Sequence, residues 1–262
     1  MSGLSAAIWA ETLKVRRSVI LWITLAIFAF IAIMIGLFVY LAQHPELIGN
    51  SAILSVKTSV LSVADWSAYF NLLQQMIAVL GMIGYGFVFS WVYGREYSDR
   101  TIKDLLALPV PRSTIVIAKL IIASIWCVLL TIILFVFGVI SGKLVSMTGW
   151  SNVLLWNSCK IFSLTALLTI ILSTPVAFFA SAGRGYLVPI GYLILLMILT
   201  QFIVAAIPTI APYLPWAIPA LSSGAAGPES SHLGIISYLI LIFTGIAGLI
   251  GTLAWWRYAD QT

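Results

Sequence analysis

The sequence predicts an all-α membrane protein with six transmembrane helices. Only 8% of its 262 residues are charged and 62% are hydrophobic, against about 25% and about 45–50% in a soluble domain. Long uncharged stretches recur along the chain, and the cations gather in a few of the segments between them. So little charge cannot cover a water-facing surface. An ordinary soluble enzyme and a disordered chain are therefore excluded, and the net charge of +5 indicates membrane orientation rather than nucleic-acid binding.

About 20 apolar residues are needed to cross the ~30 Å hydrocarbon core. The uncharged stretches place the six spans at about residues 19–42, 69–93, 115–140, 157–182, 185–207 and 233–256. All of them belong to one transmembrane domain, 1–262, because no hydrophilic segment is long enough to fold separately.

The segment before the last span is apolar but carries Pro208, Pro212, Pro215 and Pro219. Four prolines so close together cannot form one regular helix. We therefore expect residues 208–232 to be an outer segment that lies in the interface or re-enters the membrane. The alternative, in which it crosses the membrane, gives seven spans.

The cations set the orientation. With the N-terminus in the cytoplasm, ten fall inside and three, Lys57, Lys143 and Lys160, fall outside. The ten are Lys14, Arg16, Arg17, Arg95, Arg100, Lys103, Arg112, Lys119, Arg184 and Arg257. This bias agrees with the positive-inside rule and predicts that both termini are cytoplasmic.

Residues 1–18 combine apolar Leu4, Ile8 and Trp9 with cations that follow them. This pattern predicts an interfacial helix on the inner leaflet, with a plain juxtamembrane tail as the alternative.

The loop of residues 94–114 holds four of the ten inner cations. Ser98 or Asp99 can cap a helix that begins there, and Pro109 and Pro111 end it. Its apolar residues are Ile102, Leu105, Leu106 and Leu108. We expect a short cytoplasmic amphipathic helix, which either docks in another protein's groove or packs on its own bundle. Lys119 follows in the next span, within snorkelling reach of the interface.

The loop resembles a known signature. It contains Glu96, Arg100-Thr101, Leu105-Leu106, Pro109-Val110-Pro111-Arg112 and Lys119, which is similar to the pattern of type-2 ABC transporter permeases. The short bacterial members of this family, linked to bacitracin, lantibiotic or sodium export, share the length and the six-span plan. Their N-terminal Glu…Lys…Arg pattern is matched here by Glu11, Lys14 and Arg17. The chain departs from the family at Arg100, where many relatives have Gly, so the opening turn of the loop is expected to differ.

The resemblance implies that the loop is a coupling helix that contacts a separate ABC ATP-binding subunit. It implies no catalysis in this chain, with ATP and Mg bound by that partner, and a homodimer or a heterodimer with a sister permease in a bacterial plasma membrane. The candidate contact or support residues are Glu96, Asp99, Arg100, Thr101, Lys103, Asp104, Leu105 and Arg112.

Several motifs are absent from the sequence. It has no G-x-x-x-x-G-K-[ST] phosphate loop; the nearest match, at Gly138 and Gly142, fits close helix packing better. The predicted spans contain no Asp or Glu, which disfavours an ion-coupled transporter. No constellation of catalytic or metal-binding residues stands out, so the chain is not expected to be an enzyme.

Asn71, Gln74 and Gln75 share one face of the second predicted span at i, i+3 and i+4. They either line a translocation path or form interhelical hydrogen bonds. The cargo is expected to be a peptide antibiotic or another amphipathic compound. The remaining alternative for the chain is a non-ABC pore, sensor or assembly scaffold.

Overall fold

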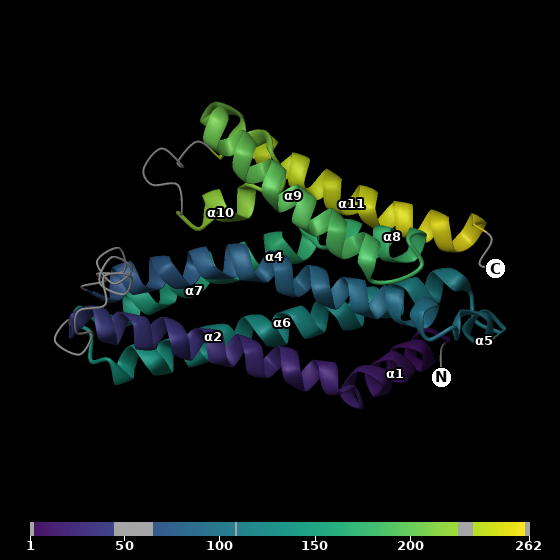
Figure 1. Cartoon of the computed structure of the whole chain (residues 1–262), viewed down its shortest axis with the longest axis horizontal. Helices are drawn as coiled ribbons and strands as arrows, with labels where there is room; N and C mark the ends of the chain where they lie inside the picture. The colour runs from purple at the N-terminus through teal and green to yellow at the C-terminus, as the bar shows by residue number, and fades with distance from the viewer. Residues whose placement is uncertain (1–2, 45–64, 108, 225–232, 260–262) are drawn as a thin grey trace.

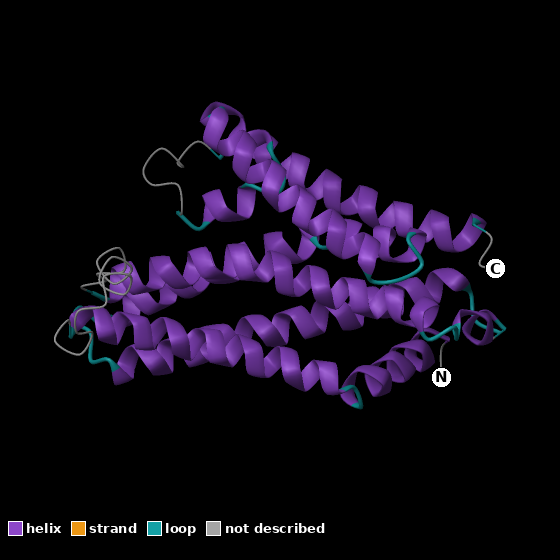
Figure 2. Ribbon diagram, in the orientation of Figure 1, coloured by secondary structure: helices purple, strands orange, loops and turns teal. Residues whose placement is uncertain are grey.

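The computed structural model describes residues 3–44, 65–107, 109–224 and 233–259. These residues form helices joined by short loops, with no strand among them (Figure 2). Six helical stretches in the described part are long and apolar enough to cross a membrane, which confirms the predicted all-α membrane fold. They are Val19–Gln43, Trp66–Ser98, Arg112–Leu144, Asn152–Ala182, Leu187–Ala206 and Ile235–Tyr258.

The first two helices are separated by a sharp break. Helix α1 (Gly3–Arg16) ends just before Ser18, whose hydroxyl accepts a hydrogen bond from the backbone N–H of Ile20 at 3.1 Å. This N-cap fixes the start of α2 (Val19–Gln43). Glu11 and Val15 are buried on α1, while Trp9 is exposed. The helix thus packs on the bundle through a face that contains a carboxylate.

The remaining long helices form a bundle with two sides (Figure 1). Their bounds are α4 (Trp66–Ser98), α6 (Arg112–Leu144), α7 (Asn152–Leu172), α8 (Thr174–Ala182), α9 (Leu187–Ala206) and α11 (Ile235–Tyr258). Helix α6 packs on α1, α2 and α4, and α8 packs on α4, α9 and α11. Pro175, in the first turn of α8, separates it from α7 because its ring cannot continue a regular helix.

Glycines allow the closest helix contacts. A Cβ added at Gly142 would come within 2.8 Å of the Trp66 ring, and one at Gly138 within 2.9 Å of Leu73. The two glycines therefore pack α6 closely against α4, as the sequence predicted. On the other side, a Cβ at Gly248 would lie 2.5 Å from the backbone nitrogen of Pro175, so α11 lies directly against α8.

The proline-rich segment forms short helices, η2 (Pro208–Tyr213) and α10 (Ile218–Ser222), as its prolines predict. Ile218 is fully buried in a cluster with Leu168 and Leu241, and the hydroxyls of Ser222 and Thr165 lie 3.4 Å apart. The described part of the segment therefore folds back onto α7 and α11. Its depth in the membrane stays a prediction, and residues 225–232 lie outside the described part of the chain.

Both termini and α5 (Ile102–Leu106) lie at the same end of the bundle (Figure 1). The turn at Gly185 also lies there, since its carbonyl oxygen is 3.0 Å from a Cβ placed on Gly94. The ten cations assigned to the cytoplasm therefore lie on helices, or in the turns between helices, that converge at this end. Which leaflet surrounds it stays a prediction, and Lys57 lies outside the described residues.

Candidate functional site

The candidate site lies where α4 ends and α5 begins. Helix α4 runs on through Ser98, Asp99 is its C-cap, and Arg100 follows with φ at 58°. The backbone N–H of Thr101 donates to the carbonyl of Glu96 at 2.9 Å, and that of Arg100 to the carbonyl of Tyr97 at 3.2 Å. These two bonds form a Schellman motif, which turns the chain sharply into α5.

This turn corrects one expectation. Ser98 and Asp99 do not cap the start of α5, because both still belong to the end of α4. Thr101 takes the N-cap position and makes no side-chain cap hydrogen bond. Arg100, which stands where many relatives have Gly, adopts the left-handed backbone conformation. Glycine adopts this conformation without cost. The turn is therefore one that glycine favours, held here by an arginine.

Four charged side chains beneath this turn form an ionic cluster, which comprises Glu11, Lys14, Glu96 and Lys119. The Lys119 ammonium donates to Glu96 Oε1 at 2.6 Å and to Glu11 Oε2 at 3.3 Å. Lys14 donates to Glu11 Oε1 at 2.6 Å and to Glu96 Oε1 at 3.1 Å. The backbone carbonyl of Val92 accepts a further bond from Lys119 at 2.9 Å. The cluster thus contains two cations and two anions, each paired with both opposite charges.

Burial makes these pairs strong. The side chain of Lys119 is fully buried, those of Glu96 and Glu11 are 4% and 7% exposed, and only Lys14 reaches 33%. Burial alone would lower the pKa of Lys14, but the carboxylates of Glu96 and then Glu11 raise this pKa above its ordinary value. Glu96 Oε2 is buried and has no hydrogen-bond partner among the described residues.

The cluster joins three helices that are distant in sequence. Glu11 and Lys14 come from α1, Glu96 from the last turn of α4, and Lys119 from the second turn of α6. The expected snorkelling of Lys119 is wrong, because its ammonium finds buried carboxylates within the bundle instead of the interface. The i,i+3 spacing of Glu11 and Lys14 was visible in the sequence, but nothing local indicated that they meet residues 82 to 108 positions away.

The loop residues divide into supporting and exposed sets. Arg112 donates from a guanidinium N–H to the carbonyl of Trp256 at 3.1 Å, which fastens the start of α6 to the end of α11. Arg95 Nε pairs with Asp99 at 3.2 Å. The side chains that face away from the bundle are those of Asp99, Arg100, Thr101, Lys103 and Asp104, with Leu105 half-buried.

A hollow of about 420 Å³ lies beside α5. Its lining combines carboxylates and cations with one hydroxyl and one apolar side chain, from Lys14, Arg95, Glu96, Asp99, Thr101, Asp104 and Leu105. Three carboxylates and two cations line the hollow, and Lys119, which pairs with Glu96 at 2.6 Å, balances the third carboxylate.

The three amides of the second span lie near the far end of α4. Gln74 is buried, and its Nε2 approaches the carbonyl of Ser158 on α7 at 3.5 Å, while Asn71 is exposed and Gln75 is half-buried. Gln74 therefore lies in a helix interface, whereas a role for Asn71 and Gln75 in a translocation path stays a prediction.

The fold defines a class, the multi-span helical membrane proteins. Residues 7–202 match the family model described as ABC-2 family transporter protein, so the chain belongs to the ABC-2 family and is the membrane subunit of an ABC transporter. The chain is also similar to the bacitracin transport permease protein BCRB of Bacillus licheniformis, at 26% identity over 186 residues, which cover 71% of this chain and 88% of the relative. Family membership excludes the non-ABC pore, sensor or scaffold considered above.

Proposed function

We propose that the chain is the permease of an ATP-driven exporter and that α5 is its coupling helix, which docks on a separate ATP-binding subunit. ATP and Mg would be bound by that subunit. The proposal rests chiefly on the ionic cluster, because it links the turn that presents α5 to two other helices through buried charges.

A movement of α5 has a direct mechanical consequence in this arrangement. Helix α5 lies between α4 and α6, and Lys119 on α6 pairs with Glu96 on α4 at 2.6 Å. A buried ion pair resists separation strongly. When the ATP-binding subunits close, α5 would therefore shift the inner ends of α4 and α6 together and carry α1 with them, as a rigid-body switch.

The surface around α5 is suited to a protein contact. Lys103 and Asp104 are exposed at neighbouring positions on α5, and the adjacent hollow is lined by the carboxylates of Glu96, Asp99 and Asp104. A cationic side chain of the ATP-binding subunit would fit there, and the unpartnered Oε2 of Glu96 would accept a hydrogen bond from it. Such complementarity favours specific and rapid association.

A second permease, either another copy or a sister chain, would complete the translocation path. This inference is supported by α9, because only 11% of its most apolar 18-residue stretch is buried within one chain. The rest of that stretch is available to contact a second permease. Because the relative BCRB is described as a bacitracin transport permease, we propose an amphipathic peptide antibiotic as the cargo, with export from the cytoplasmic end that carries α5.

The coupling proposal is tested by exchanging two charges on α5. The double variant Lys103→Glu/Asp104→Lys keeps the net charge and hence the topology signal. It is expected to reduce ATPase activity that co-purifies with the chain, because it reverses the charge pattern offered to the partner. Lys160→Gln, exposed at the other end of the bundle, is the matched control. Unchanged ATPase recruitment in the double variant would contradict the role of α5.

The cargo proposal is tested separately by deleting the gene and measuring susceptibility to bacitracin-like peptides. Increased susceptibility, restored by the wild-type chain and not by the α5 double variant, is expected. Unchanged susceptibility with intact ATPase recruitment would remove the peptide cargo and leave the coupling proposal standing.

A further inference from the structure

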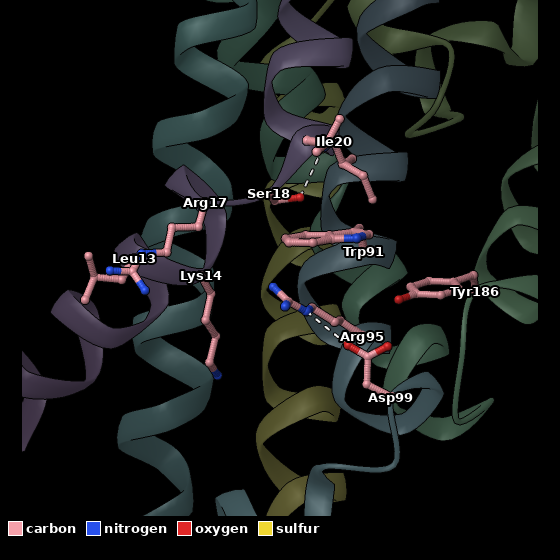
Figure 3. Close-up of a pocket in the computed structure, with 10 residues that line it drawn as sticks. Leu13, Lys14, Arg17, Ser18, Ile20, Trp91, Arg95, Asp99 and Tyr186 are labelled. Atoms are coloured by element: carbon pink, nitrogen blue, oxygen red, sulfur yellow. Dashed lines mark hydrogen bonds and ion pairs between the residues drawn. The ribbon is translucent and has the colours of Figure 1, made fainter.

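A second pocket, of about 610 Å³, opens where α1 meets α2. Figure 3 shows Lys14 and Arg17 on one side of it and Trp91 and Arg95 on the other, with Tyr186 facing Arg95. Among its lining residues are three cations and one carboxylate, Asp99. Lys14, Arg95 and Asp99 also line the hollow beside α5. Arg17 adds a further cation on this side, so the pocket attracts an anionic group.

The contacts of Arg95 leave it able to bind such a group. Its guanidinium carbon lies 5.0 Å from the centre of the Trp91 ring, and its Nε pairs with Asp99 at 3.2 Å. These contacts leave its Nη1 buried and without a hydrogen-bond partner among the described residues. A buried cationic donor without an acceptor is costly. A phosphate oxygen is the acceptor that best matches the planar guanidinium.

An apolar groove between α2 and α4 adjoins the pocket at Ile20. Ile20 lines both, and the groove has a volume of about 410 Å³. Its other walls are Ile23, Thr24, Ile27, Phe28, Ile31, Leu80, Ile83, Gly84 and Phe87. The single hydroxyl, of Thr24, is already bonded to the carbonyl of Leu21 at 2.8 Å. From Ile20 to Ile31 the helix rises about 16 Å, which is about one leaflet of a ~30 Å core.

We propose that this site binds one anionic phospholipid, with its phosphate against Arg95, Arg17 and Lys14 and an acyl chain in the α2–α4 groove. The charges select an anionic headgroup, and the adjoining groove selects a lipid over a free phosphate ion. A second copy of the apolar α2 face would fill the groove but would leave the Arg95 donor unpaired. Because Lys14 also belongs to the ionic cluster, the lipid would stabilise the position of α1 against α4.

The test uses the purified full-length chain and native mass spectrometry, with phosphatidylglycerol and phosphatidylcholine offered in equal amounts. Retention of phosphatidylglycerol is expected, and Arg95→Gln and Arg17→Gln are each expected to reduce it about fivefold, as for the loss of one cation near an anionic surface. Arg16→Gln is the matched control, because Arg16 is exposed and precedes Arg17 directly in the chain but does not line the pocket. Melting temperatures of the variants verify that each is folded.

The groove is tested by Ile83→Trp, which fills it, against Ile242→Trp on another apolar surface. Only the first is expected to reduce lipid retention, and inorganic phosphate is expected not to displace the lipid. Three results would overturn the proposal: equal retention of phosphatidylcholine, an equal loss in Arg16→Gln, or full displacement by inorganic phosphate. A dimer that Ile83→Trp dissociates, with no bound lipid, would assign the groove to a second copy and overturn it as well.

Discussion

The replacement Glu96→Gln tests the ionic cluster at its centre. Glu96 Oε1 accepts from Lys119 at 2.6 Å and from Lys14 at 3.1 Å. The neutral amide leaves the cluster with two cations and one anion, and the fully buried Lys119 keeps only Glu11, at 3.3 Å. Removing one partner of a buried pair costs about 3–5 kcal/mol. The remaining carboxylate and the partial exposure of Lys14 place the expected loss near the lower end.

A loss of about 3 kcal/mol lowers the melting temperature of a chain of this size by about 6–12 °C. The assay is thermal unfolding of the purified chain in one detergent, followed by circular dichroism. Asp99→Asn is the matched control, because it breaks the Arg95–Asp99 pair, whose side chains are 33% and 51% exposed. An exposed pair contributes about 0–1 kcal/mol, so this control is expected to lose less than about 4 °C.

The double variant Glu96→Gln/Lys119→Met separates charge imbalance from lost packing. Each replacement has a shape similar to that of the charged side chain it removes. One anion and one cation are lost, so the cluster is neutral again. It is expected to be more stable than Glu96→Gln alone. The reasoning is refuted if Glu96→Gln lowers the melting temperature no more than the Asp99→Asn control does. It is also refuted if the loss of stability in the double variant equals the sum of the losses in Glu96→Gln and Lys119→Met.

Three further outcomes are expected from thermal unfolding of the same purified chain. Arg100→Gly should raise the free energy of unfolding by up to about 1 kcal/mol, because glycine adopts the φ of 58° without strain; an unchanged or lower melting temperature would refute the left-handed turn. Gly248→Ala should destabilise the chain by about 1–3 kcal/mol, because its Cβ would meet Pro175 at 2.5 Å, whereas Gly191→Ala, with nothing within 4 Å, should stabilise it or leave it unchanged. The pKa of Lys14 is raised above its ordinary value of 10.5, so the stability it contributes is fully present below that pH and declines as the pH rises through the raised pKa. The difference in melting temperature between wild type and Lys14→Met should therefore be constant from about pH 7 to pH 9 and shrink in more alkaline buffer.

The membrane fold could be predicted because it depends on local composition. An uncharged stretch of about 20 residues is sufficient to indicate a span, and each such stretch is helical, although the fourth is divided into α7 and α8. The break in the helix at the proline-rich segment could also be predicted, since Pro208 and Pro212 interrupt a helix whatever surrounds them. The end of α4 was placed too early because charged Arg95 and Glu96 suggested a loop, whereas a helix continues through charges that find partners.

The site was predicted only in part because its partners are distant in sequence. The loop signature indicated Glu96 and Lys119 separately, but their contact depends on how α4 and α6 pack. Glu11 joins them only after α1 folds back across the bundle. The left-handed conformation of Arg100 was likewise hidden, because an arginine in the sequence gives no sign of positive φ. Its place where many relatives have Gly suggested instead that the opening turn would differ.

The most direct measurement of the central claim is a site-specific cross-link between α5 and the ATP-binding subunit in native membranes. A photoreactive amino acid replaces Lys103, and the control carries it in place of Lys160, which is exposed far from α5. The account predicts a cross-link to the ATP-binding subunit from position 103 and none from position 160. An ATP-binding subunit that co-purifies with the chain but cross-links to neither position, or equally to both, would contradict the assignment of α5 as the coupling helix.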